Sequence, residues 1–260
     1  MMLKAWLKEQ QPNSFWLVCA RTHNQALTSN GFGFDNAAPL FWGNTFKDVM
    51  ALSPWLIPVS DEVLALDEGL LNQGLGIATT CSVTTIRHLR SMLMSALDGE
   101  EVLFRFYDKV VIGPMLKAMM PSEIQQFLGN IDSLALVDDK LISFTRHSQS
   151  HFELKKETWW KLQPHHLAPI YNTKHHAIAI EKRCWELIPD ILEQLDEPLQ
   201  VISNALERGI ELGYPVSELE ACAIVELAQR SNSHLLQLSE PLRLTEQELS
   251  LLKVIQEGWV

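Results

Sequence analysis

The residues of this chain with the greatest chemical reactivity are four cysteines and nine histidines. Cys81 follows a predicted strand and precedes a predicted helix, where a nucleophile elbow would place it and where a helix N-terminus lowers a thiol pKa. However, Thr79 and Val83 stand where that motif has glycines. We therefore expect Cys81 to be a packed thiol, with a Cys/His-dependent hydrolase as an alternative function.

The cysteines and histidines also suggest no metal centre. Cys19, Cys81, Cys184 and Cys222 are widely spaced, and no pair has CxxC spacing. We expect them to be buried free thiols in a reducing compartment. The histidines to consider are His147, His151, His165, His166, His175 and His176. Adjacent histidines point apart on a helix or strand and no HExxH motif occurs, so we expect no metal and no cofactor.

The overall charge limits the partners. The 260 residues carry a formal net charge of −11, and 47% of them are hydrophobic. An acidic surface repels phosphate backbones and anionic membranes, so we expect no nucleic-acid binding and no stable membrane association. We expect that the first residues are not a signal peptide, and no apolar stretch reaches the roughly 18 residues of a membrane span. We expect a soluble cytoplasmic protein.

Short apolar runs predict strands in the first part of the chain. These runs are 15–20, 55–59, 75–80, 102–107, 134–137 and 141–144, the last two as a hairpin. Helices are predicted between them, at 82–97 with Asp98-Gly99 as its end, at 110–119, and from Pro121 with Ser122 and Gln125 at capping-box spacing. Alternating strands and helices predict an α+β lobe, α/β-like, on one mixed sheet.

Strand patterns disappear after Leu162, and apolar residues recur at helical spacing. Ser217 with Glu220 and Thr245 with Glu248 are predicted capping boxes. We therefore predict two domains, an α/β lobe at 1–162 and an all-helical lobe at 163–260.

The run Glu101-Val102-Leu103-Phe104-Arg105-Phe106-Tyr107-Asp108, with the proline-started helix that follows, is the most informative in the chain. It resembles the signature of a domain-of-unknown-function family found beside type VI secretion effector and VgrG genes in bacteria. The segments at 53–59, 88–90 and 242–249 resemble other parts of that family in the same order. The resemblance covers residues 15–145 well and the helical lobe loosely.

The resemblance implies a chaperone or adaptor without enzymatic activity. The N-terminal lobe would bind a toxic effector and keep it soluble, and the helical lobe would help load it onto the VgrG spike protein. An immunity protein that binds the toxin is a further alternative function.

Two groups of residues are candidates for partner contact. Arg105, Phe106, Tyr107 and Asp108 either fix the strand-to-helix turn or contact the partner. The tryptophans Trp42, Trp55, Trp159 and Trp160 are candidate partner contacts, because tryptophan is enriched at binding hot spots.

Overall fold

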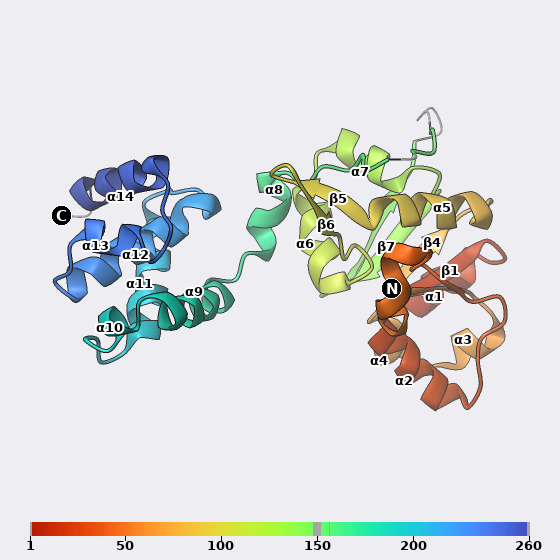
Figure 1. The fold of residues 1–260 in the computed structure, drawn as a ribbon. Helices are drawn as coiled ribbons and strands as arrows, with labels where there is room; N and C mark the ends of the chain where they lie inside the picture. The colour runs from red at the N-terminus through yellow and green to blue at the C-terminus, as the bar shows by residue number, and fades with distance from the viewer. Residues whose placement is uncertain (1, 148–151, 156, 259–260) are drawn as a thin grey trace. The chain divides into compact units, whose positions relative to one another are not determined.

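The computed structural model describes residues 2–147, 152–155 and 157–258, and it separates into two compact units, Met1–Ile170 and Tyr171–Val260 (Figure 1). The boundary thus lies after Ile170, where the sequence had suggested 162/163. Helix α8 (Pro164–Leu167) and the 3-10 helix η2 (Ala168–Ile170) both pack against α6 (Lys109–Ala118), which places them in the first unit.

The first unit is built on a six-stranded sheet of order β2-β3-β1-β4-β7-β8. The strands are β1 (Ser14–Val18), β2 (Ala38–Pro39), β3 (Trp55–Pro58), β4 (Leu75–Ala78), β7 (Ser133–Val137) and β8 (Leu141–Thr145). The α+β class is confirmed. The strand directions are more uniform than expected, because every neighbouring pair described in this sheet is antiparallel.

Alternating side chains give the sheet two buried faces. Along β1, Trp16 and Val18 point into one core, while Leu17 points into the other. The first core is completed by α1 (Leu3–Glu9), α2 (Ala20–Asn30), α3 (Asp61–Ala65) and α4 (Glu68–Leu71). The second is completed by α5 (Ser82–Met92), α6 and α7 (Pro121–Leu128), so the sheet lies between two helical layers.

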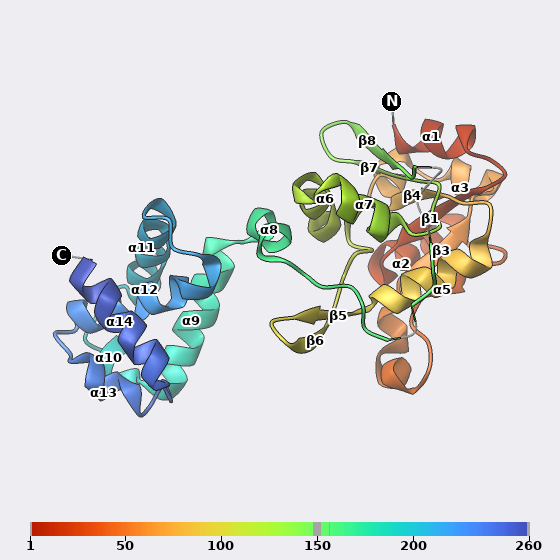
Figure 2. The same cartoon turned by 90° about the horizontal axis from the view of Figure 1, so that it is seen from above.

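Residues 94–107 differ from the prediction. Helix α5 ends at Met92, and β5 (Met94–Leu97) pairs with β6 (Glu100–Leu103) in a hairpin separate from the main sheet (Figure 2). Asp98 and Gly99 have φ values of 51° and 90°, which suit a tight two-residue turn rather than a helix end. The predicted strand 102–107 is therefore wrong beyond Leu103.

The second unit is helical, as predicted. It contains α9 (Thr173–Leu187), α10 (Pro189–Leu192), α11 (Pro198–Glu211), η3 (Val216–Glu218), α12 (Leu219–Arg230), α13 (Leu235–Ser239) and α14 (Glu246–Gly258). Helix α11 packs against α9 and α12, and α12 packs against α14, around one apolar core. Among the described residues, no helix combines the length and the apolar character that crossing a membrane requires.

One of the two capping boxes predicted in this unit forms. Thr245 Oγ1 accepts the Glu248 N–H at 3.2 Å, and a Glu248 oxygen accepts the Thr245 N–H at 2.7 Å. The second predicted box is absent, because Glu220 forms an ion pair with Arg183 on α9.

Candidate functional site

The Arg-Phe-Tyr-Asp segment forms the turn between β6 and α6. Phe106 and Tyr107 are 0% and 6% exposed and belong to the core. Asp108 caps α6, because its Oδ1 accepts the Val110 N–H at 3.1 Å. Its Oδ2 accepts a hydrogen bond from the Arg105 guanidinium at 2.5 Å. The Arg105 side chain nevertheless remains 57% exposed, so it lies on the surface beside a fixed turn.

This turn forms one wall of a cavity of about 710 Å³. The other walls come from the end of β1, the start of α2 and the 3-10 helix η1 (Asn44–Leu52). We call this cavity the turn groove, lined by residues 19–22, 41, 49, 52, 73, 103, 105 and 107–110. Its floor is apolar, because Phe41 is 2% exposed and stacks on Phe46 with ring centroids 4.4 Å apart.

Large apolar side chains remain exposed along the rim of the turn groove. Val49, Leu52, Leu103 and Val110 are 40%, 64%, 44% and 75% exposed. They come from η1, β6 and α6, and nothing in the described part of the first unit covers them. Clustered exposed apolar side chains of this kind commonly mark a protein interaction site.

The residues that line the turn groove carry a net positive charge, opposite in sign to the net charge of the whole chain. Arg21, Arg105 and Lys109 line it, against the single carboxylate of Asp108. Lys109 Nζ donates to the neutral Asn72 carbonyl at 2.8 Å, and its charge also acts at longer range on Asp138. The groove is therefore locally cationic in a chain whose net charge is −11.

A second cavity of about 690 Å³ continues from the turn groove along α2. The two share Ala20, Arg21 and Leu52. Beyond them, this second cavity is lined by Ala51 and by uncharged polar residues of α2, namely Asn24, Gln25, Thr28 and Ser29. The two cavities therefore adjoin, and they differ in charge because the second has no charged side chain beyond the shared Arg21.

The segment at 88–90, which the resemblance singles out, holds helices together. His88 is 1% exposed, and its Nε2–H donates to the Phe127 carbonyl at the end of α7 at 2.8 Å. Burial lowers the pKa of His88 and outweighs the opposing effect of this hydrogen bond. Leu89 is in the core, and Arg90 donates to the Pro39 carbonyl at 2.8 Å.

The four candidate tryptophans lie in different environments. Trp42 is 69% exposed, with the Arg90 guanidinium 5.0 Å from its ring centroid. Trp55 is partly buried in β3, and Trp159 Nε1 donates to Ser91 Oγ at 3.0 Å. Trp160 is 3% exposed and lies in the core, so its burial does not fit partner contact. None of the four lines the turn groove.

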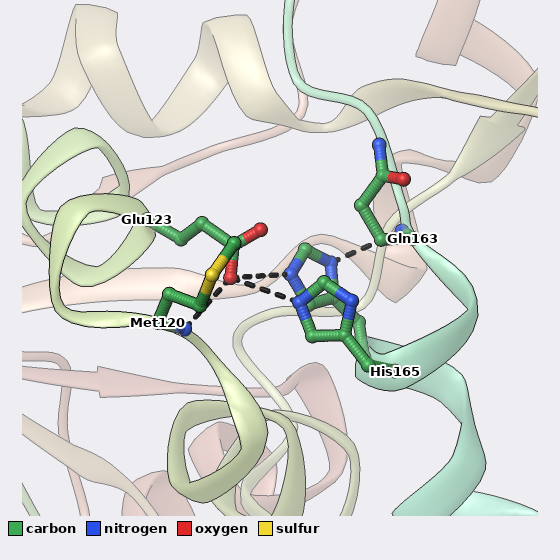
Figure 3. A network of polar contacts seen from close by, with 5 residues as sticks. Met120, Glu123, Gln163 and His165 are labelled. Carbon is green, nitrogen blue, oxygen red and sulfur yellow. Dashed lines mark hydrogen bonds and ion pairs between the residues drawn. The ribbon is translucent and has the colours of Figure 1, made fainter.

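A second polar site joins α7 to α8. The Glu123 Oε2 atom lies 2.9 Å from His165 Nε2 and 3.2 Å from His166 Nε2, and it accepts the Met120 N–H at 2.7 Å (Figure 3). Partial burial raises the pKa of Glu123, but hydrogen bonds from His165, the Met120 amide and His166 outweigh it and lower the pKa to about 2. The expectation that the paired histidines point apart is wrong here, because both rings turn toward Glu123.

The donor atoms of Glu123, His165 and His166 lie within 4.8 Å of one another, which is close enough to surround a metal ion. However, the Gln163 N–H donates to His166 Nδ1 at 3.1 Å. A neutral ring that accepts at Nδ1 carries its proton on Nε2, which then has no lone pair for a metal. The Met120 amide and His165 thus donate hydrogen bonds to the Glu123 carboxylate, His166 Nε2 lies in polar contact with it at 3.2 Å, and these contacts fasten α8 to α7.

Of the remaining candidate cysteines and histidines that the structure describes, Cys19 alone lines one of the two sites. His147 and His175 are exposed, Tyr171 bonds to His176 at 2.8 Å, and His151 lies outside the described residues. Cys184 and Cys222 are buried, and Cys19 lines the turn groove. The expectation of a packed thiol is wrong for Cys81, which is exposed and contacts Thr84 Oγ1 at 3.1 Å.

Comparison with known proteins gives one match. Residues 15–126 match the model of a domain of unknown function (DUF4123). The DUF4123 match begins in β1 and ends in α7, and it contains the Arg105–Asp108 turn. Every residue that lines the turn groove and its continuation along α2 lies inside it. No curated protein and no solved structure gives a significant match.

Proposed function

We propose that this protein is a cytoplasmic adaptor of a type VI secretion system. In this proposal it binds one toxic effector, keeps it soluble and helps load it onto the VgrG spike protein. DUF4123 domains are linked to effector adaptors of this kind. The observation that carries the proposal is the exposed, unpartnered turn groove, whose lining falls entirely within the DUF4123 match.

The physical mechanism is reversible recognition without bond making or a cofactor. A partner that covers an aggregation-prone apolar surface stabilises the soluble form by mass action. The apolar floor and rim of the turn groove, bordered by charged residues, have the composition of the centre and edge of a protein interface. The helical unit, with its own core, would serve the loading step.

Co-expression with the effector encoded beside this gene tests the proposal. We expect the effector to be soluble and to co-purify with this chain, and to be insoluble or unsecreted without it. Equal solubility and equal secretion in the absence of this chain would refute the adaptor function. Inhibition of the effector's toxic activity in the complex would instead support an immunity protein.

A further inference from the structure

The turn groove and its continuation along α2 specify the chemistry of what they bind. We propose that they bind an apolar peptide segment of a partner protein that carries carboxylates next to its apolar side chains. This inference rests on the proposed function, because it takes the segment to belong to the effector. The effector segment would dock in the turn groove, and it would need both apolar and carboxylate side chains.

The exposed apolar side chains of the turn groove favour an apolar ligand. Leu52 and Val110 stand on opposite walls and are 64% and 75% exposed, above a buried aromatic floor. Covering such side chains removes apolar surface from water, which favours binding before the costs of association are subtracted. A polar ligand would gain little of this free energy.

The cations that line the turn groove favour a ligand that carries carboxylates. Three cations line the turn groove, and the two not bonded to a carboxylate are Arg21, on α2, and Lys109, at the start of α6. Because the protein as a whole is strongly acidic, an acidic partner is repelled from most of its surface. The turn groove is a place where carboxylates are instead attracted, so charge directs such a segment to it.

The shape favours a peptide over a compact metabolite. The two cavities share one wall at Ala20, Arg21 and Leu52 and extend along α2. Asn24, Gln25 and Thr28 on the second half offer donors and acceptors at a spacing that follows the helix. Two adjoining cavities, one lined by three cations and the other by no charged side chain beyond the shared Arg21, fit a chain segment.

Fluorescence anisotropy of the purified full-length chain tests this directly. The probes are a short fluorescein-labelled peptide of leucine and glutamate and the matching peptide of leucine and lysine. We expect saturable binding of the glutamate peptide that weakens as salt rises, because ionic contacts are screened. We expect weaker binding of the lysine peptide by about tenfold or more.

Variants locate the binding site. Val110→Glu and Arg21→Glu should each weaken binding of the glutamate peptide by about tenfold. The matched control is Val83→Glu, since Val83 lies on α5 of the same unit, is 68% exposed and does not line the groove. It should leave binding within about twofold. Circular dichroism of each variant verifies that it is folded.

Three outcomes overturn the proposal: no saturable binding of the glutamate peptide, equal binding of the lysine peptide, or equal weakening by Val83→Glu. Co-purification of the effector separates this result from the proposed function. If Val110→Glu and Arg21→Glu still retain the effector, the adaptor function stands and the groove assignment fails. If the wild-type chain retains no effector, the adaptor function itself fails.

Discussion

At the scale of single residues, contacts to the Glu123 Oε2 atom explain why His165 and His166 lie together. The Glu123 carboxylate is 15% exposed and receives donors from two helices. The His165-His166 pair, for which the sequence predicted no metal role, thus fastens α8 to α7. Their partner precedes them by about forty residues, so neighbouring sequence alone does not reveal it.

Glu123→Gln should destabilise the first unit by about 1–3 kcal/mol at pH 7, because it removes a charged acceptor from N–H donors. The pKa of Glu123 is about 2 in the folded protein, below its ordinary 4.5. Its stabilising effect is therefore complete above pH 4.5 and is lost as the pH falls toward 2. Urea unfolding at several pH values measures this, and a wild-type–variant difference that stays constant down to pH 2 would contradict it.

Gly129→Ala should destabilise the protein by on the order of 2–4 kcal/mol. Gly129 has φ +59°, and an added Cβ would lie 2.4 Å from His88 Nε2. The side chain would disturb the bond from His88 to Phe127. Thermal unfolding measures the loss. Gly33→Ala is the matched control, since Gly33 has open space around it, and an equal loss in both variants would rule out this explanation.

At the scale of elements, local pattern identified five strands of the main sheet. The apolar runs at β1, β3, β4, β7 and β8 are continuous and bounded by breaks, so their period and length suffice to predict these strands. The same pattern failed at 94–107, where Phe104 and Phe106 continue an apolar run although the chain has left the strand. Their burial is decided by tertiary packing against Phe127, which no local pattern encodes.

The turn groove was only partly predictable, because tertiary packing brings together walls that are distant in the sequence. The Arg105–Asp108 turn is visible in the sequence, and Val110 stands two residues after Asp108. The opposite wall, from α2 and η1, is brought there by the sheet, and neither helix was predicted. Arg21, Leu52 and Val49 therefore entered the site only through the structure.

The β5–β6 hairpin should depend on its turn. Gly99→Ala should cost about 1–2 kcal/mol, because a Cβ disfavours left-handed backbone by that amount. The Gly99 φ is +90° and nothing lies within 4 Å of its Cβ position, so the effect comes from backbone conformation alone. Asp98→Asn is the control, since asparagine tolerates φ of 51°. Amide hydrogen exchange at β5 and β6 should accelerate in Gly99→Ala and remain unchanged in Asp98→Asn.

At the scale of the whole molecule, the buried residues divide into cores that respect the unit boundary. The second unit buries its own cluster, built entirely from residues 177–255. The first unit has two clusters on the two faces of its sheet. The DUF4123 match ends at 126, before β7 and β8, which complete that sheet.

Fragments that keep a whole core should fold, whereas a fragment cut at the end of the DUF4123 match should not. Residues 171–260 expressed alone should be helical and unfold cooperatively, and residues 1–170 should fold as an α+β unit. Residues 1–126 should fail to fold, because they lack Phe127, Leu128 and strand β7. Circular dichroism and urea titration of the three fragments measure this, and a cooperatively folded 1–126 fragment would refute it.

Because Cys81 is exposed, its thiol is a practical site for covalent labelling. Its thiol lies at the start of α5, and hydrogen bonds from Thr84 lower its pKa. Burial raises the pKa of Cys184 and of Cys222 to about 11, so these two react slowly at neutral pH. Cys19, in the turn groove, is only partly exposed, so a maleimide dye should attach first at the exposed Cys81, outside the groove, and report on partner capture by the native chain without any engineered cysteine.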